Sequence, residues 1–173
     1  LTVASVGLPE KVLREEGIPC LTAIIHTPHH AGYYPGSHPM TVKIVFSPDG
    51  GRLLGAQIVG RDGVDKRIDV LSALMRKGGS ICDLTEMEHA YAPPYSSSKD
   101  PVNIAGFVAE NLISGLDRQA GWEDVQNNMS GSVFLLDVRM EKELKGGIIP
   151  GSVNIPLDSL RERLEEIPKD RPV

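Results

Sequence analysis

Several features are scarce in this chain of 173 residues, and each shortage excludes a class of protein. Acidic residues outnumber basic ones 23 to 18, and the basic residues form no run or helical stripe, so nucleic acid and anionic membranes are poor partners. No segment approaches the roughly 18 consecutive apolar residues that span a bilayer. We therefore predict a cytoplasmic protein with neither a membrane nor a nucleic-acid partner.

Cysteine is also scarce, and the histidines occur without the accompanying cysteines of a standard zinc site. The two cysteines, Cys20 and Cys82, are too far apart for a C-x-x-C pair, and free Cys packs as a small hydrophobe, so we predict buried structural thiols. One stretch holds four histidines, His26, His29, His30 and His38. Their spacing matches no standard zinc pattern, which predicts loop or interface roles and no bound metal.

The residues that are present make a globular composition. Hydrophobic residues account for 40% and charged residues for 24%, which argues against disorder, and the length allows one large or two small domains. The chain opens with Leu1-Thr2-Val3, without Met, and these residues read as a strand. We expect the natural chain to begin upstream.

Strand signals dominate the first third of the chain. Residues 1–6 and the apolar, β-branched run 20–27 each predict a strand, and a short helix over 9–17, opened by proline and ended by glycine, separates them. Residues 41–46 alternate in polarity, and a Pro-Asp-Gly-Gly turn leads into 52–59. This pattern predicts an antiparallel hairpin.

Helix signals follow the hairpin. The first helix spans 64–77, with a predicted buried stripe of Val64, Ile68, Leu71 and Met75. Its charged residues are assigned to the solvent face: Asp65, Lys66, Arg67, Asp69, Arg76 and Lys77.

A second helix is predicted over 80–88. A third begins at the N-cap Asp100, before Pro101, and ends at Gly115. Its predicted buried stripe is Ile104, Val108 and Leu112. The whole pattern predicts an α+β domain over 1–115, an antiparallel sheet with helices packed on it.

A different pattern begins after residue 115. Residues 116–131 predict a linker with a short helix over Trp122–Asn127. The apolar run Val133–Leu136 is typical of a strand buried on both faces of a parallel sheet, and leucines at helical spacing predict an amphipathic helix over Leu157–Ile167. Residues 132–173 therefore predict an α/β segment that is truncated, because it is too small to bury an independent core.

Two segments concentrate tyrosine beside proline and glycine. One holds Tyr91, Pro93 and Tyr95, and the other holds Tyr33 and Tyr34. Prolines restrict the backbone, so these phenols would lose little entropy on binding, and a phenol can donate a hydrogen bond to a developing thiolate or lie against a flavin. The alternative is that they pin loops and pack a subunit interface.

Four motifs occur together and in order along the first domain: His30–Gly36, Leu54–Gln57, Gly63–Asp69 and Ala90–Tyr95. Over about residues 1–115 they resemble the dimerisation domain of the pyridine nucleotide-disulfide oxidoreductases, in the branch of coenzyme A-disulfide reductases and NADH oxidases. The resemblance implies a homodimer formed through 1–115. It also implies an enzyme that uses FAD and NAD(P)H to reduce a coenzyme A disulfide, persulfide or polysulfide.

The same resemblance implies roles for the tyrosine loops. Tyr91, with Tyr33 or Tyr34, would act in trans beside the substrate at the partner's active site, and Tyr91, Pro93 and Tyr95 would lie near the partner's flavin. No G-x-G-x-x-G motif follows a strand here, so the cofactors and the redox cysteine are expected mainly outside these residues, and the chain alone is not expected to be active. An NADH oxidase or peroxidase and a purely structural dimerisation module are the alternatives.

The last part of the chain resembles a rhodanese domain over about 122–173. The motifs are Leu135–Arg139 and Gly147–Pro156. Ile148 stands where rhodaneses commonly have histidine, and we expect Asp137 and Arg139 to organise the scaffold. The rhodanese nucleophile, a cysteine in a loop after the next strand, is expected beyond Val173. The order of domains fits a coenzyme A-disulfide reductase fused to a rhodanese domain.

Overall fold

The computed structural model describes residues 1–128 and 132–173. It divides the chain into two compact units, Leu1–Gln119 and Ala120–Val173. The first unit is an antiparallel sheet with helices packed on it, and the predicted α+β fold is confirmed. No helix of the described residues combines the length and the hydropathy needed to cross a bilayer.

The sheet of the first unit has four strands in the order β1-β4-β3-β2, and every neighbouring pair is antiparallel. The strands are β1 (Thr2–Gly7), β2 (Leu21–Pro28), β3 (Pro39–Phe46) and β4 (Leu53–Gly60). The predicted hairpin is therefore confirmed as β3 and β4. Side chains alternate between the two faces of β3, and those of Val42, Ile44 and Phe46 are fully buried on one face, where they form part of the core. Each such side chain contributes about 1.5–3 kcal/mol by burial.

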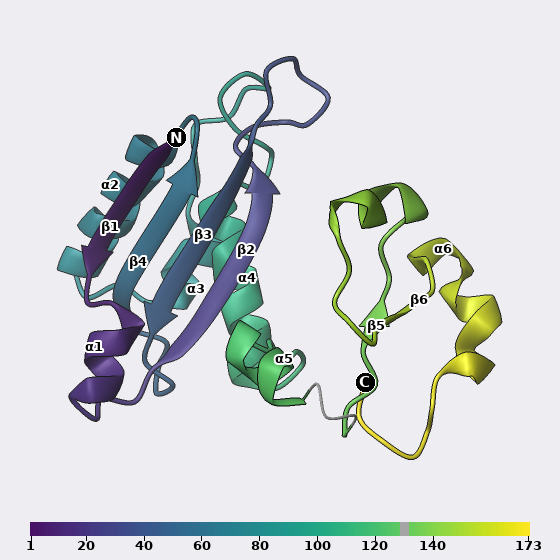
Figure 1. Cartoon of the computed structure of the whole chain (residues 1–173). Helices are drawn as coiled ribbons and strands as arrows, with labels where there is room; N and C mark the ends of the chain where they lie inside the picture. The colour runs from purple at the N-terminus through teal and green to yellow at the C-terminus, as the bar shows by residue number, and fades with distance from the viewer. Residues whose placement is uncertain (129–131) are drawn as a thin grey trace. The chain divides into compact units, whose positions relative to one another are not determined.

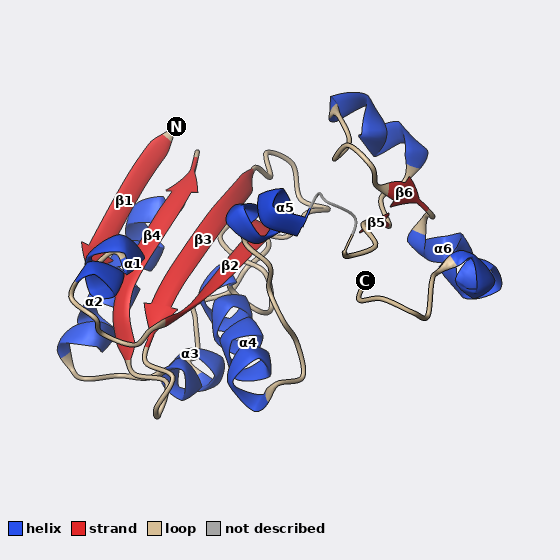
Figure 2. Cartoon of the chain, turned by 60° about the horizontal axis from the view of Figure 1, so that its bottom comes forward, coloured by secondary structure: helices blue, strands red, loops and turns tan. Residues whose placement is uncertain are grey.

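Three helices cover that apolar face, as Figures 1 and 2 show: α2 (Val64–Arg76), α3 (Ile81–Glu86) and α4 (Pro101–Ser114). The short helix α1 (Glu10–Glu15) is held to the sheet by an ion pair between Glu10 and Lys43. Lys43 alternates with the buried Val42 and Ile44, so α1 is tied to the opposite face.

The buried stripe of α4 differs from the predicted one. Ile104, Val108 and Leu112 are only partly buried. The fully buried positions are instead Val102, Ala105 and Ala109. The reason is the close approach of α3: a Cβ at Gly106 would stand 2.8 Å from the Cβ of Leu84. Helices this close require small side chains at the contact, so the small-residue face of α4 turns inward.

The prediction of two buried cysteines is wrong. Cys82 is exposed, because it follows Ile81 on the short helix α3, whose inward side is taken by Ile81 and Leu84. Cys20 is half-buried at the residue before β2 begins. Neither forms a disulfide.

Two long loops lie side by side at one end of the sheet in Figure 1. The 29–38 loop joins β2 to β3, and the 87–99 loop joins α3 to α4. Backbone hydrogen bonding connects them, since the amide of Ala31 donates to the carbonyl of Ser96 at 3.1 Å. All of the chain's tyrosines lie on these two loops.

The second unit has short elements. They are α5 (Trp122–Asn128), β5 (Leu136–Asp137), the 3-10 helix η1 (Glu141–Gly146), β6 (Val153–Asn154), α6 (Leu157–Leu160) and the 3-10 helix η2 (Arg161–Glu166). Residues 129–131 of the predicted linker lie outside the described residues. β5 and β6 are parallel, as expected. The strand predicted at Val133–Leu136 is not buried on both faces: its side chains are half-buried, and β5 is short because it pairs only with β6 among the described residues.

The amphipathic helix predicted over Leu157–Ile167 is also broken. α6 ends at Leu160, and η2 contains a non-helical residue, Arg163, with φ −112°. Leu157 is 65% and Leu164 52% exposed, so the leucine stripe has little to pack against in the described part of this unit. A helix of this length depends on such packing, which explains the break.

Candidate functional site

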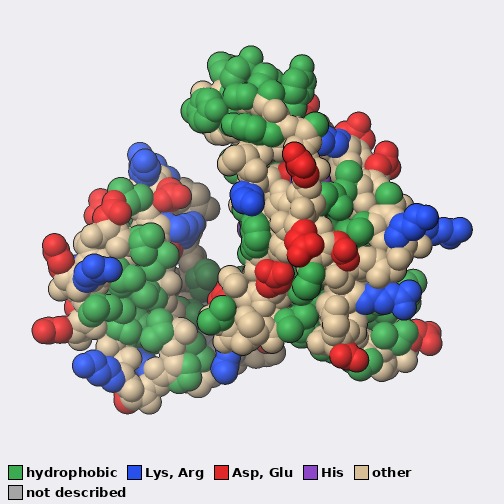
Figure 3. Space-filling view, turned by 180° about the vertical axis from the view of Figure 1, so that it is seen from behind, with side chains coloured by type: hydrophobic (Ala, Val, Ile, Leu, Met, Phe, Trp, Pro, Cys, Tyr) green, Lys and Arg blue, Asp and Glu red, His purple; other side chains and the backbone are tan. Residues whose placement is uncertain are grey.

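The tips of the two loops carry exposed tyrosines. Tyr33 is 78% exposed, Tyr34 41%, Tyr91 50% and Tyr95 70%. Figure 3 shows a gathering of hydrophobic side chains at the projecting end of the first unit, at the top of the view. A globular domain normally covers such large aromatic surfaces, so this cluster is suited to contact another molecule.

Tyr33 and Tyr91 form a pair across the two loops. A hydrogen bond between their side chains, followed by desolvation and the charge interaction between them, raises the pKa of Tyr33 above its ordinary value. A tyrosine phenol is protonated at neutral pH in any case, so Tyr33 can donate a hydrogen bond. The structure thus brings together two of the three tyrosines that the sequence assigns to the substrate.

The other two tyrosines have separate surroundings. The ring of Tyr34 meets the ring of His30 edge to face, with centroids 5.8 Å apart. Tyr95 lies in a turn in which its amide donates to the carbonyl of Ala92 at 2.9 Å. Of Tyr33 and Tyr34, it is thus Tyr33 that joins Tyr91.

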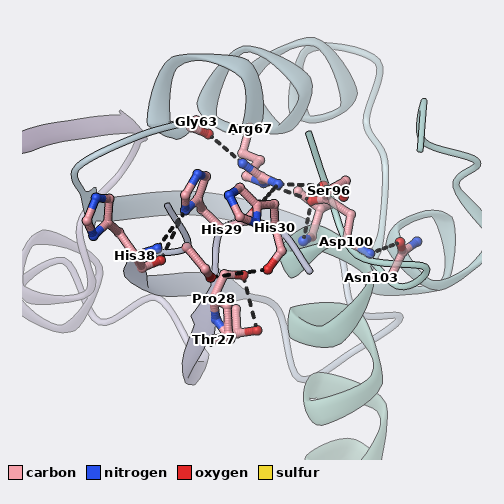
Figure 4. Close-up of polar contacts among 12 residues, drawn as sticks. Thr27, Pro28, His29, His30, His38, Gly63, Arg67, Ser96, Asp100 and Asn103 are labelled. Carbon is pink, nitrogen blue, oxygen red and sulfur yellow. Dashed lines mark hydrogen bonds and ion pairs between the residues drawn. The ribbon is translucent and has the colours of Figure 1, made fainter. Parts of the chain in front are cut away.

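The base of both loops is a buried ion pair, shown in Figure 4. Arg67 of α2 donates from Nε to Oδ1 of Asp100 at 3.0 Å and from Nη2 to Oδ2 at 2.8 Å. Its side chain is 1% exposed and that of Asp100 is 0% exposed. The assignment of Arg67 to the solvent face of its helix is therefore wrong. The physical reason is that Asp100 neutralises the guanidinium, which could not be buried alone.

Arg67 and Asp100 satisfy most of their remaining hydrogen-bonding capacity within the two loops. Nη2 of Arg67 also donates to the carbonyl of His29 at 2.6 Å, and Nη1 donates to the carbonyl of Gly63 at 3.0 Å. Asp100 accepts from the hydroxyl of Ser96 at 2.6 Å and from the amide of Val102 at 3.1 Å. We refer to Arg67, Asp100, Ser96 and the His29 carbonyl as the loop anchor.

The charges of the loop anchor set the protonation of Asp100. Burial alone raises the pKa of this carboxyl, but hydrogen bonds from Arg67 and Ser96 and the charge of Arg67 outweigh it, so the pKa lies below its ordinary value. Asp100 is consequently ionised at neutral pH, and the pair is a true ion pair. Nearby His89 has a lowered pKa, chiefly from desolvation.

The histidines of the 29–38 loop pack against one another. The rings of His29 and His30 lie 4.2 Å apart, and those of His29 and His38 stack at 6.1 Å. His29 Nδ1 accepts from the amide of His38 at 3.1 Å. Within the described ranges, 1–128 and 132–173, no group of three or more potential ligands could hold a metal ion.

The second unit has its own arginine–aspartate pair. Arg139 donates to both oxygens of Asp137 and, at 2.9 Å, to the carbonyl of Gly147, while Asn154 donates to the carbonyls of Asp137 and Arg139. Asp137, Arg139 and Gly147 line a hollow of about 400 Å³, together with Ile148. Asp137 and Arg139 thus organise the β5–β6 scaffold.

Comparison with known proteins decides what the first unit is. Residues 1–101 match the dimerisation domain of the pyridine nucleotide-disulphide oxidoreductases. The chain belongs to this family. Residues 122–173 match the rhodanese-like domain. Family membership accounts for the antiparallel sheet of the first unit, and the two matches bear out the resemblances drawn from the motifs.

Three known proteins are especially similar. The coenzyme A disulfide reductase of Staphylococcus epidermidis is 43% identical over 109 residues, which are 63% of this chain and 24% of that enzyme. The reduced CoADR-RHD of Bacillus anthracis has a TM-score of 0.94 and 46% identity over 98% of this chain and 30% of its own. An NAD-dependent persulfide reductase from A. fulgidus has a TM-score of 0.87 and 38% identity, over 97% of this chain and 30% of its own. The chain thus spans about a quarter to a third of these relatives.

Sequence reasoning found the tyrosine loops but missed the loop anchor. The local pattern identifies Asp100 only as an N-cap and Arg67 only as a solvent-facing charge. One signal pointed to burial: Arg67 follows the buried Val64 by three positions and precedes the buried Leu71 by four, so it lies on the apolar stripe of α2. A charge on such a stripe needs a buried partner.

Proposed function

We propose that this family member is the dimerisation region of a FAD-dependent NAD(P)H oxidoreductase that reduces a coenzyme A disulfide, persulfide or polysulfide. Residues 1–115 would form a homodimer and present Tyr33 and Tyr91 to the active site of the partner subunit. The observation that carries the proposal is the exposed Tyr33–Tyr91 pair. Its placement outside the domain's own core makes it available to another subunit.

The chemistry of the pair suits thiol–disulfide exchange. When a thiolate attacks a disulfide, the leaving sulfur develops negative charge, and a donor beside it stabilises that charge. A tyrosine phenol keeps its proton at neutral pH, so Tyr33 and Tyr91 can both serve as donors. FAD and NAD(P)H, bound mainly outside these residues, would supply the electron pair. Pro93 and Tyr95 would lie on the flavin side of Tyr91.

The relatives support this choice of substrate. A coenzyme A disulfide reductase and an NAD-dependent persulfide reductase are 43% and 38% identical to this chain. The rhodanese-like segment favours a sulfur substrate over oxygen, because rhodanese chemistry proceeds through a cysteine persulfide. We also propose a cytoplasmic location.

The first test replaces the phenols in the full-length enzyme. Tyr91→Phe and Tyr33→Phe should each lower kcat for coenzyme A disulfide about tenfold or more, since a general acid contributes roughly 10²- to 10⁴-fold and one phenol remains in each variant. Tyr34→Phe should lower kcat less, because the ring of Tyr34 packs against His30. Unchanged kinetics in both Tyr33→Phe and Tyr91→Phe would reject the catalytic role. Oxygen uptake in place of thiol formation would identify an NADH oxidase.

A hybrid dimer tests action in trans. One subunit carries Tyr33→Phe and Tyr91→Phe, and the other lacks the redox cysteine, so each homodimer is impaired. If the tyrosines serve the partner, the hybrid has one intact site and recovers about half of the wild-type activity per dimer; if they serve their own subunit, no site is intact. Activity no greater than that of the homodimers would therefore refute the trans arrangement.

A further inference from the structure

We propose that Arg67 and Asp100 are positioning residues that set the distance between Tyr33 and Tyr91, so that the loop anchor determines how fast the paired phenols act on the sulfur substrate. This inference rests on the proposed function, because it assigns a cause to the geometry of the same site. Their side chains are at most 1% exposed, so we assign them no direct contact with substrate or flavin. They act through the loops that they hold.

The first step of the argument is that the loop anchor joins separate segments. The guanidinium of Arg67, from α2, holds the backbone of the 29–38 loop at the His29 carbonyl. The same group holds Asp100, at the end of the 87–99 loop, through two parallel hydrogen bonds. One planar side chain therefore fixes both tyrosine-bearing loops to one rigid helix (Figure 4).

The second step concerns the other end of the 87–99 loop. Asn103 of α4 donates to the carbonyls of Leu84 and Met87, at 2.8 and 2.9 Å, where α3 ends and the loop begins. The side-chain oxygen of Asn103 accepts from the amide of Asp100 at 2.9 Å. Both ends of the loop are therefore tied to the same turn of α4, and the loop leaves the domain in a defined direction.

The third step is that the tyrosine pair spans the two tied loops. Tyr33 is four residues beyond the anchored His29, and Tyr91 is four residues beyond the anchored Met87. The middle of the 87–99 loop is tied in turn, because Ser96 donates to Asp100 and accepts from the amide of Ala31. The backbone hydrogen bond between the two loops weakens steeply with distance and angle, so Tyr33 and Tyr91 stay within reach of each other only while both loops keep their register.

The fourth step is that burial makes the loop anchor rigid. The Arg67 and Asp100 side chains are at most 1% exposed, so water and salt do not compete for them as they do for a surface pair. Lysine cannot replace the arginine, because a single ammonium cannot reach both carboxylate oxygens in parallel and also the His29 carbonyl. The site therefore depends on the shape of this side chain as well as on its charge.

The experiment uses the full-length holoenzyme with coenzyme A disulfide as substrate. Arg67→Lys keeps the positive charge but loses the two parallel N–H donors of the guanidinium. It should lower kcat roughly 10- to 100-fold, which is the cost of displacing a group at a reacting centre by about 1 Å. Ser96→Ala is the milder variant, which leaves the ion pair in place, and should lower kcat a few-fold. Glu10→Gln is the matched control, because it breaks the ion pair with Lys43 on the other face of the sheet.

A double-mutant comparison separates positioning from general damage. Each anchor variant is made in the wild type and in a Tyr33→Phe, Tyr91→Phe background. If the loop anchor acts through the phenols, Arg67→Lys and Ser96→Ala should cost little further activity once the hydroxyls are gone. The reduction of an artificial electron acceptor, which takes electrons from the flavin without a sulfur substrate, should keep its wild-type rate in Ser96→Ala.

The outcomes distinguish the two proposals. Wild-type kinetics in the Tyr→Phe double variant would reject the proposed function, and this inference with it. Slow Tyr→Phe variants combined with wild-type rates in both Arg67→Lys and Ser96→Ala would reject the inference alone. An equal loss in both backgrounds, or an equal loss in Glu10→Gln, would show that the loop anchor matters only for stability, which also overturns the inference.

Discussion

Two arginine–aspartate pairs in this chain have almost the same contacts and opposite surroundings. In the first unit Arg67 donates from Nε and Nη2 to Asp100 at 3.0 and 2.8 Å; in the second, Arg139 donates from the same atoms to Asp137 at 3.0 and 2.7 Å. The side chain of Arg67 is 1% exposed, whereas that of Arg139 is 42% exposed. The same hydrogen-bonding chemistry can therefore act inside a domain or in a half-exposed scaffold, and burial decides how much stability depends on it.

The difference extends to the cores beneath the two pairs. The loop anchor lies above a continuous apolar core built from the sheet, α2, α3 and α4. In the second unit Ile155 is the only fully buried hydrophobic residue among those that the structure describes. A buried pair needs such a core to exclude water, so the second unit cannot make its pair equally important.

The largest expected effect comes from breaking the buried pair. Arg67→Met leaves the Asp100 carboxylate without its partner, and should lower the free energy of unfolding by about 3–5 kcal/mol. Arg139→Met, the matched change in the exposed pair, should have a much smaller effect. Urea denaturation followed by circular dichroism measures both. Equal shifts in the two variants would contradict the comparison.

The next prediction compares how Asp100 and Asp137 make stability depend on pH. The pKa of Asp100 is lowered in the folded chain, so its contribution to stability is complete above the unfolded value near 3.8 and is lost as the pH falls toward the folded pKa. The pKa of Asp137 is also lowered, by hydrogen bonds from Arg139, but this carboxyl lies nearer to water. Asp100→Asn should therefore flatten the acid limb of the stability curve more than Asp137→Asn. Urea midpoints between about pH 6 and 2.5 test this.

The smallest expected effect tests the packing around Arg67. Gly63 has φ +68°, and an added Cβ would stand 2.2 Å from Nη1 of Arg67. Gly17 has φ +67° with nothing within 4 Å, so it is a matched control for the backbone cost alone. Gly17→Ala should cost about 1–2 kcal/mol, and Gly63→Ala should cost more because the guanidinium must move. Thermal melting of the two variants measures this difference. Equal decreases in melting temperature for Gly17→Ala and Gly63→Ala would mean that the loop anchor tolerates displacement.

Much of the fold was predictable from local pattern. The hairpin of β3 and β4 follows from strict alternation and a turn rich in glycine, and α4 begins at the predicted cap, where Asp100 accepts from the amide of Val102. Both signals act over a few residues and so are visible in the sequence. The second unit was predicted less well, because a helix such as the one expected over Leu157–Ile167 depends on partners for its leucines.

The candidate site likewise combines features that the sequence determines with features that only the tertiary structure shows. The sequence alone determined that the tyrosines lie on proline-rich loops and that the chain resembles a disulfide reductase domain, because motif order and composition are local properties. Only the tertiary structure decided that Tyr33, and not Tyr34, meets Tyr91, and that Arg67 is buried against Asp100. Those contacts join residues 58 and 33 positions apart in the chain (91 − 33 and 100 − 67), and no local pattern specifies which distant carboxylate will neutralise a charge on an apolar stripe.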